Sequence, residues 1–104
     1  MDDFRLVLVT APDENIADSL AKGLVEKKLA ACVSEVPGLI SRYYWAGKLQ
    51  KDKEILLIIK TRAPQVPGII SYVKKNHSAQ LPEIISLPIA EGEKGYLEWL
   101  RRQL

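Results

Sequence analysis

Hydrophobic and β-branched residues are densest between residues 31 and 61, in two segments separated by the turn sequence Ala46-Gly47-Lys48. This pattern predicts a β-hairpin. At roughly 3.3 Å per residue, a straight strand over residues 31–45 would reach about 45–50 Å, whereas a domain of this size is only about 33 Å across. We therefore expect the first arm to bend at Pro37-Gly38, because proline has no N–H for a strand ladder, or the hairpin to project beyond its domain, or both.

The second arm of the hairpin contains five consecutive apolar residues, 55–59, with no polar alternation. Such a run is typical of a strand that is covered on both faces. A single chain of 104 residues supplies few covering layers, so the pattern favours self-association of subunits on the hairpin. The alternative is a central strand covered by the chain's own helices on one face and by a loop on the other.

The segment before the hairpin predicts one strand and one helix. Residues 4–10 form a short apolar run, which indicates a strand that is buried on both faces or nearly so. Apolar residues then recur at helical spacing to about Lys28. Either Thr10 or Asp13 has the side-chain oxygen that the N-cap of this helix requires.

The segment after the hairpin predicts a helix, a strand and a second, short helix. The first helix begins at Ala63-Pro64 and ends at Asn76-His77, and residues 83–89 form the last strand. Pro88 places the end of that strand, or a sheet edge, at this position. Residues 92–104 carry apolar side chains at helical spacing and close the chain as a short helix.

The predicted order of elements is βαββαβ with an added C-terminal helix. This α+β order is that of the ferredoxin-like sandwich, in which both crossover helices lie on one face of an antiparallel sheet. The other face of the sheet is left bare. In an oligomer, we expect that face and the protruding hairpin to be covered by partner subunits.

The composition fits one soluble domain, residues 1–104, with 47% hydrophobic and 27% charged residues. The 15 basic and 13 acidic residues give a formal charge of +2, and the basic ones are dispersed, so we expect no nucleic-acid partner. A single cysteine excludes an intramolecular disulfide. The N-terminus lacks the features of a signal peptide and no segment has membrane-spanning length, so we predict a cytoplasmic protein with no membrane partner.

Catalytic motifs are weak in this sequence. No glycine-rich loop has the spacing of a P-loop or of a dinucleotide fold. The only residues that favour an enzyme are Cys32 and His77, the one cysteine and the one histidine of the chain. They lie far apart in the sequence. We therefore expect a protein that is not an enzyme.

Cys32, His77 and Glu83 are the candidate metal ligands. A stable zinc or copper site normally uses three or four ligands, which one chain cannot readily bring together here but an oligomer could supply across an interface. The alternative is that Cys32 is buried as a small hydrophobe and that His77 simply closes a helix.

Aromatic residues gather beside the turn of the hairpin, at Tyr43, Tyr44 and Trp45, and again at Tyr96 and Trp99. Such side chains can form a ligand platform. More often they bury a large area at interfaces while their polar tips find partners.

Several spaced motifs together make the chain similar to the CutA1 divalent-cation-tolerance family over almost its whole length. They are Glu26-Lys27-Lys28-Leu29-Ala30-Ala31-Cys32-Val33, Ser41-x-Tyr43-x-Trp45-x-Gly47-Lys48, Asp52-x-Glu54, Ile59-Lys60-Thr61, Pro82-Glu83-Ile84 and Pro88-Ile89-x-x-Gly92-x-x-x-Tyr96-Leu97-x-Trp99. The resemblance implies a ferredoxin-like homotrimer, similar in architecture to the PII signalling proteins, with clefts between subunits.

The resemblance also implies positions for the functional residues. The cleft would be lined by Tyr43, Trp45, Lys60 and Thr61. The trimer interface would include Ile55, Leu57, Ile58, Ile59 and Trp99. The family is linked to tolerance of copper and other divalent metals, and no catalytic activity is implied. One departure is that Ser78-Ala79 follows His77, where the family usually has Pro-Tyr, so an aromatic side chain beside the cleft is missing.

Two functional hypotheses follow. The first is a non-enzymatic, metal-responsive trimer, with Cys32, His77 and Glu83 as ligands and copper as the favoured metal. The alternative is a PII-like signalling trimer that binds a small anionic metabolite or a protein partner and transmits occupancy through the hairpin.

Overall fold

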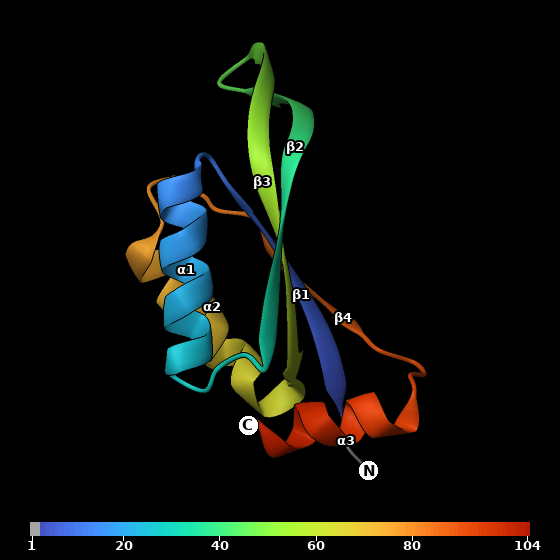
Figure 1. The fold of residues 1–104 in the computed structure, drawn as a ribbon. Helices are drawn as coiled ribbons and strands as arrows, with labels where there is room; N and C mark the ends of the chain where they lie inside the picture. Colours follow the sequence, from blue (N-terminus) through green and yellow to red (C-terminus); the bar gives the residue numbers. More distant parts are fainter. Residues whose placement is uncertain (1–2) are drawn as a thin grey trace.

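The computed structural model describes residues 3–104 and shows a four-stranded sheet with two helices on one face and a third helix at one end (Figure 1). The sheet order is β2-β3-β1-β4 and all neighbouring strands are antiparallel. This is the predicted ferredoxin-like fold. The elements are β1 (Phe4–Ala11), α1 (Glu14–Glu26), β2 (Cys32–Trp45), β3 (Lys48–Arg62), the 3₁₀ turn η1 (Ala63–Gln65), α2 (Val66–Asn76), β4 (Ile84–Pro88) and α3 (Lys94–Arg102).

Local chemistry sets the helix boundaries. The Asp13 carboxylate accepts a hydrogen bond of 2.9 Å from the backbone N–H of Ile16, so Asp13, and not Thr10, is the N-cap of α1. After α1, Lys28 turns the chain at a φ of 61°. The predicted start of the second helix at Ala63-Pro64 is a 3₁₀ turn, and α2 proper begins at Val66.

The hairpin both bends and projects, as the sequence predicted. The pairing of β2 with β3 shifts between Val36 and Leu39, and Gly38 inside this bulge has a φ of +82° that favours glycine. At the tip, Ala46 and Gly47 both have positive φ, as a two-residue type I′ turn requires. The molecule is 45 Å long but only 25 and 22 Å across, because the two arms extend past the helices (Figure 1).

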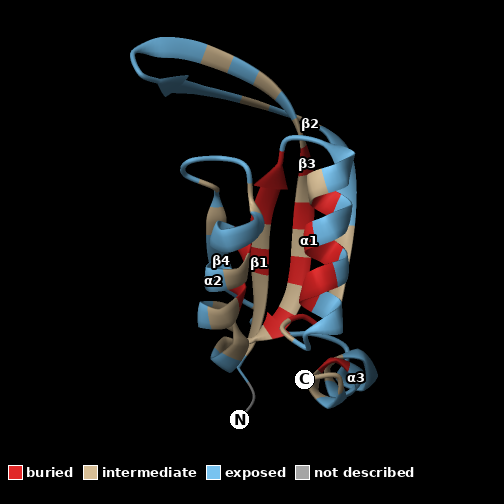
Figure 2. Ribbon diagram, turned by 90° about the vertical axis from the view of Figure 1, so that its left-hand side faces the viewer, coloured by how far each residue is buried: buried red, intermediate tan, exposed pale blue. Residues whose placement is uncertain are grey.

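The core lies between the sheet and the pair α1 and α2. Figure 2 shows the buried residues on β1, β3 and the sheet-facing side of α1, while the hairpin tip is exposed. Within β3, Ile55, Leu57 and Ile59 pack in this core. Their assignment to the trimer interface is therefore wrong, because these side chains are already enclosed by their own chain.

The opposite face of the sheet is only partly covered, and we call it the open face. Its residues share one side of the sheet through the strand register. They are half-buried or exposed, and the apolar ones are Leu6, Leu8, Val36, Leu56, Ile58, Ile85 and Leu87. Ile85 is 50% and Leu87 42% exposed. The unbroken run at residues 55–59 thus has one side in the core and one side on the open face.

No helix within residues 3–104 is long and apolar enough to cross a membrane.

Candidate functional site

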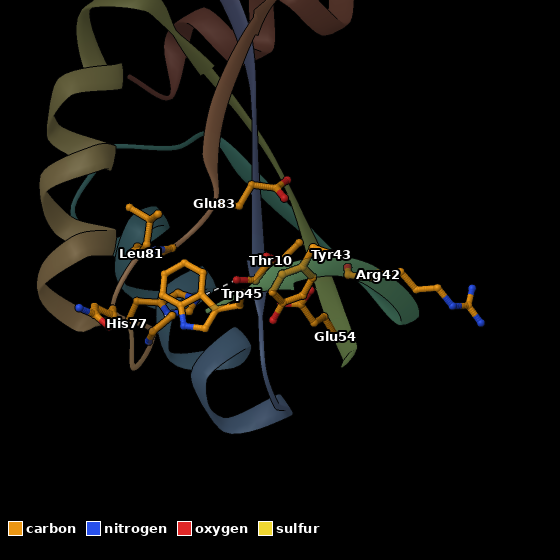
Figure 3. Close-up of a pocket in the computed structure, with 12 residues that line it drawn as sticks. Thr10, Arg42, Tyr43, Trp45, Glu54, His77, Leu81 and Glu83 are labelled. Atoms are coloured by element: carbon orange, nitrogen blue, oxygen red, sulfur yellow. Dashed lines mark hydrogen bonds between the residues drawn. The ribbon is translucent and has the colours of Figure 1, made fainter. Parts of the chain in front are cut away.

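A cavity of about 650 Å³ lies between the outer part of the hairpin, the end of β1 and the loop that follows α2 (Figure 3). Its walls come from β2, β3, the end of β1 and the loop of residues 77–83 that follows α2. The lining residues are Thr10, Ser41, Arg42, Tyr43, Trp45, Glu54, His77, Ala79, Gln80, Leu81, Pro82 and Glu83.

Strand geometry places the aromatic side chains at this cavity. Tyr43 and Trp45 are two residues apart on β2, so they project from the same side of the strand, whereas Tyr44 between them is 74% exposed and does not line the cavity. The ladder pairs Tyr43 with Gln50 and places Asp52 and Glu54 further along the same side of β3. The cavity therefore combines aromatic rings with carboxylates.

The pKa of the Tyr43 phenol is affected by neighbouring carboxylates. Its hydroxyl donates a hydrogen bond to the Asp52 carboxylate. The pKa of Tyr43 is raised, first by this hydrogen bond, then by partial desolvation and by the negative charges of Asp52 and Glu54. The carboxylates of Asp52 and Glu54 therefore lie close enough to the Tyr43 phenol to disfavour its ionised form.

His77 fastens the loop of residues 77–83 to the end of β1. Its Nδ1 accepts a hydrogen bond of 2.9 Å from the N–H of Ala79, which leaves the proton on Nε2. Nε2 lies 2.8 Å from the carbonyl oxygen of Thr10 and donates to it. Because both ring nitrogens are engaged by the backbone, a metal ion could bind His77 only by replacing one of these hydrogen bonds.

Cys32 and Lys60 lie at the other end of the open face. The ladder pairs Cys32 with Lys60, and Lys60 Nζ is 2.5 Å from Ser34 Oγ and 3.8 Å from Cys32 Sγ. The hydroxyl of Tyr96, on α3, reaches the same place. Its pKa is raised, first by burial and then by the neighbouring Cys32. Four polar groups therefore meet where α3 covers the end of the sheet.

Two of the predicted cleft residues are not in the cavity. Lys60 belongs to the cluster around Cys32. Thr61 is completely buried on the helix side of the sheet, where its hydroxyl donates to the carbonyl oxygen of Leu29 at 2.7 Å. Within one chain, β3 carries Lys60 and Thr61 to the far end of the domain from Tyr43 and Trp45, so a cleft that contains all four residues would need more than one subunit.

The predicted metal ligands are likewise divided. His77 and Glu83 line the cavity, whereas Cys32 pairs with Lys60, four residues along β3 from the partner of Thr10. That offset alone is about 13 Å. Among residues 3–104, no group of three or more His, Cys, Asp or Glu side chains could hold a metal ion.

Sequence reasoning missed Glu54, Thr10 and the loop residues as parts of the cavity. For Glu54 the sequence indicates only a solvated strand end or part of an interfacial ion pair. The alternation of Ser41, Tyr43 and Trp45 could have indicated one face of β2, and counting back from the turn gives their partners on β3. The side-chain pattern does not show that Thr10 and the loop of residues 77–83 lie against them.

A carboxyl pair outside the cavity should make stability depend on pH. Glu35 on β2 has its pKa raised to about 7, first by a hydrogen bond with Asp18 of α1, then by desolvation and by the charges of Asp18 and Glu14. Because the folded state binds this proton more tightly, its stabilisation is present below the unfolded pKa of about 4.5 and is lost as pH rises through about 7. Both carboxyls are exposed, so we expect less than about 1 kcal/mol.

Asp18→Asn should therefore flatten the loss of stability between pH 5 and pH 8. Urea unfolding at several pH values measures this, and Glu26→Gln, another exposed carboxylate of the same helix, is the control. An unchanged pH profile in Asp18→Asn would show that the two carboxyls do not share a proton.

Comparisons with known proteins agree on one family. The family model described as CutA1 divalent ion tolerance protein matches residues 5–103. The divalent-cation tolerance protein CutA of Thermus thermophilus is 50% identical over 97 residues, which cover 93% of this chain and 94% of that protein. A CutA homolog of Xenopus laevis is 48% identical over 92 residues, covering 88% of this chain and 61% of that protein.

Solved structures show the same fold. The divalent cation tolerance protein of Thermus thermophilus has a TM-score of 0.93 at 48% identity, covering 96% of this chain and 97% of that one. CutA1 from Oryza sativa has a TM-score of 0.94 at 46% identity, covering 97% and 93%. A protein from Archaeoglobus fulgidus that is named as a periplasmic divalent cation tolerance protein has a TM-score of 0.91 at 38% identity, covering 99% and 98%.

Proposed function

The chain belongs to the CutA1 divalent ion tolerance family, and from this premise we propose that it acts as a cytoplasmic homotrimer without catalytic activity that binds copper between its subunits. The observation that carries the proposal is the open face. Its half-exposed apolar side chains form a surface of the kind that marks protein interfaces.

The hairpin supports the same proposal. Its arms expose Ile40, Tyr44 and Leu49, which burial against a partner would take out of water at about 25 cal/mol per Å² of apolar area. Closed rings are the usual solution when one copy binds the next through different surfaces. The family resemblance implies three copies, so sedimentation equilibrium at micromolar concentration should give about three times the 11.7 kDa of one chain, and a monomer would contradict the proposal.

The ligand atoms available on the open face favour copper over harder metal ions. Cys32 is free and half-buried on the open face, so an assembly built on that face brings thiols of several copies together. A thiol is a soft ligand that prefers copper to magnesium or calcium. His77 and Glu83 would belong to such a site only if a neighbouring copy brought its Cys32 to the cavity, and His77 would have to release Thr10 or Ala79.

Copper binding should depend on Cys32. Calorimetric titration with Cu(II), and with Cu(I) under reducing conditions, should show saturable binding that weakens by about tenfold or more in Cys32→Ser, since one lost ligand removes over about 1.4 kcal/mol. Binding should also weaken at low pH, because ligands must lose their protons before they coordinate.

The control for this titration is Ser34→Ala, which changes a neighbour of Cys32 on the same face without removing a soft ligand. His77→Ala tests the histidine in the same way. If copper binds equally well to Cys32→Ser and to the unmodified protein, the metal sits elsewhere and this part of the proposal fails.

A further inference from the structure

We draw no further inference here: the strongest candidate, the groove between the end of α1 and α2 that Lys27, Tyr72 and Lys75 line, carries nothing, because both lysines are exposed at helix C-terminal ends, where they compensate the helix dipoles, and no buried, unpartnered polar side chain within residues 3–104 is among those that line it.

Discussion

A carboxylate placed at Ile58 should leave a folded protein that no longer assembles, whereas a carboxylate placed at Leu57 should leave no folded protein. The two residues are adjacent on β3 but point to opposite faces of the sheet. Leu57 is 0% exposed in the core. Ile58 is half-buried on the open face.

The difference follows from what an unpaired charge costs in each place. Burying a charge without a partner costs several kcal/mol, a large part of the 5–15 kcal/mol that typically stabilises a domain. Leu57→Asp should therefore unfold the chain. In Ile58→Asp the charge stays in water as long as the chain remains a monomer, and only assembly would bury it.

Circular dichroism and sedimentation equilibrium measure the two outcomes. Ile58→Ala is the control, since it removes apolar area from the open face but adds no charge, and it should weaken assembly without abolishing it. A trimeric Ile58→Asp protein would show that the open face is not the interface. A folded Leu57→Asp protein would show that the core is placed wrongly.

Gly23→Ala should destabilise the protein, although alanine is the better helix former. Gly23 is buried in α1, and a Cβ there would lie 1.8 Å from Tyr72 Oη and 2.6 Å from Tyr72 Cζ. Tyr72 of α2 must move, and it would lose its packing on the core and its position under the ammonium of Lys27, 5.9 Å from the ring.

We expect a net loss of about 1 to 2 kcal/mol from Gly23→Ala, since overpacking costs up to about 3 kcal/mol and alanine returns about 1 kcal/mol of helix propensity. In the Tyr72→Ala background the same substitution should instead stabilise, by about 1 kcal/mol. Urea unfolding of the four proteins in this cycle gives the coupling. An equal loss in both backgrounds would mean that Tyr72 is not the cause.

The hairpin shows how far the sequence could predict the fold. Strand length and the proline at position 37 indicated the bend, because proline cannot donate in a ladder. The run at residues 55–59 predicted a strand covered on both faces, and within one chain only the face that carries Leu57 is fully covered. It could not say which of Ile58 and Leu57 faces the helices, because both are apolar and the period of two leaves the choice of face open.

The site was less predictable, because it depends on contacts between distant segments. Tyr43 and Trp45 carry a visible alternation, but no strand pattern shows that Thr10 and the loop of residues 77–83 complete the cavity beside them. The role of His77 depends on two backbone groups, the carbonyl of Thr10 and the N–H of Ala79, and no pattern of side chains records them. Cys32 and His77 were grouped by their chemistry, and only the register shows that they lie apart.

The sheet order also governs the time course of folding. β1 is synthesised first but lies in the sheet between β3 and β4, which are synthesised later. Phe4 can pair with Arg62 only after β3 has been synthesised. The hairpin of β2 and β3 closes locally through its two-residue turn, in about microseconds. Distant pairings such as that of Phe4 form more slowly. During synthesis the apolar first strand therefore stays unpaired until the second arm of the hairpin has left the ribosome, and unpaired apolar strands are prone to aggregate.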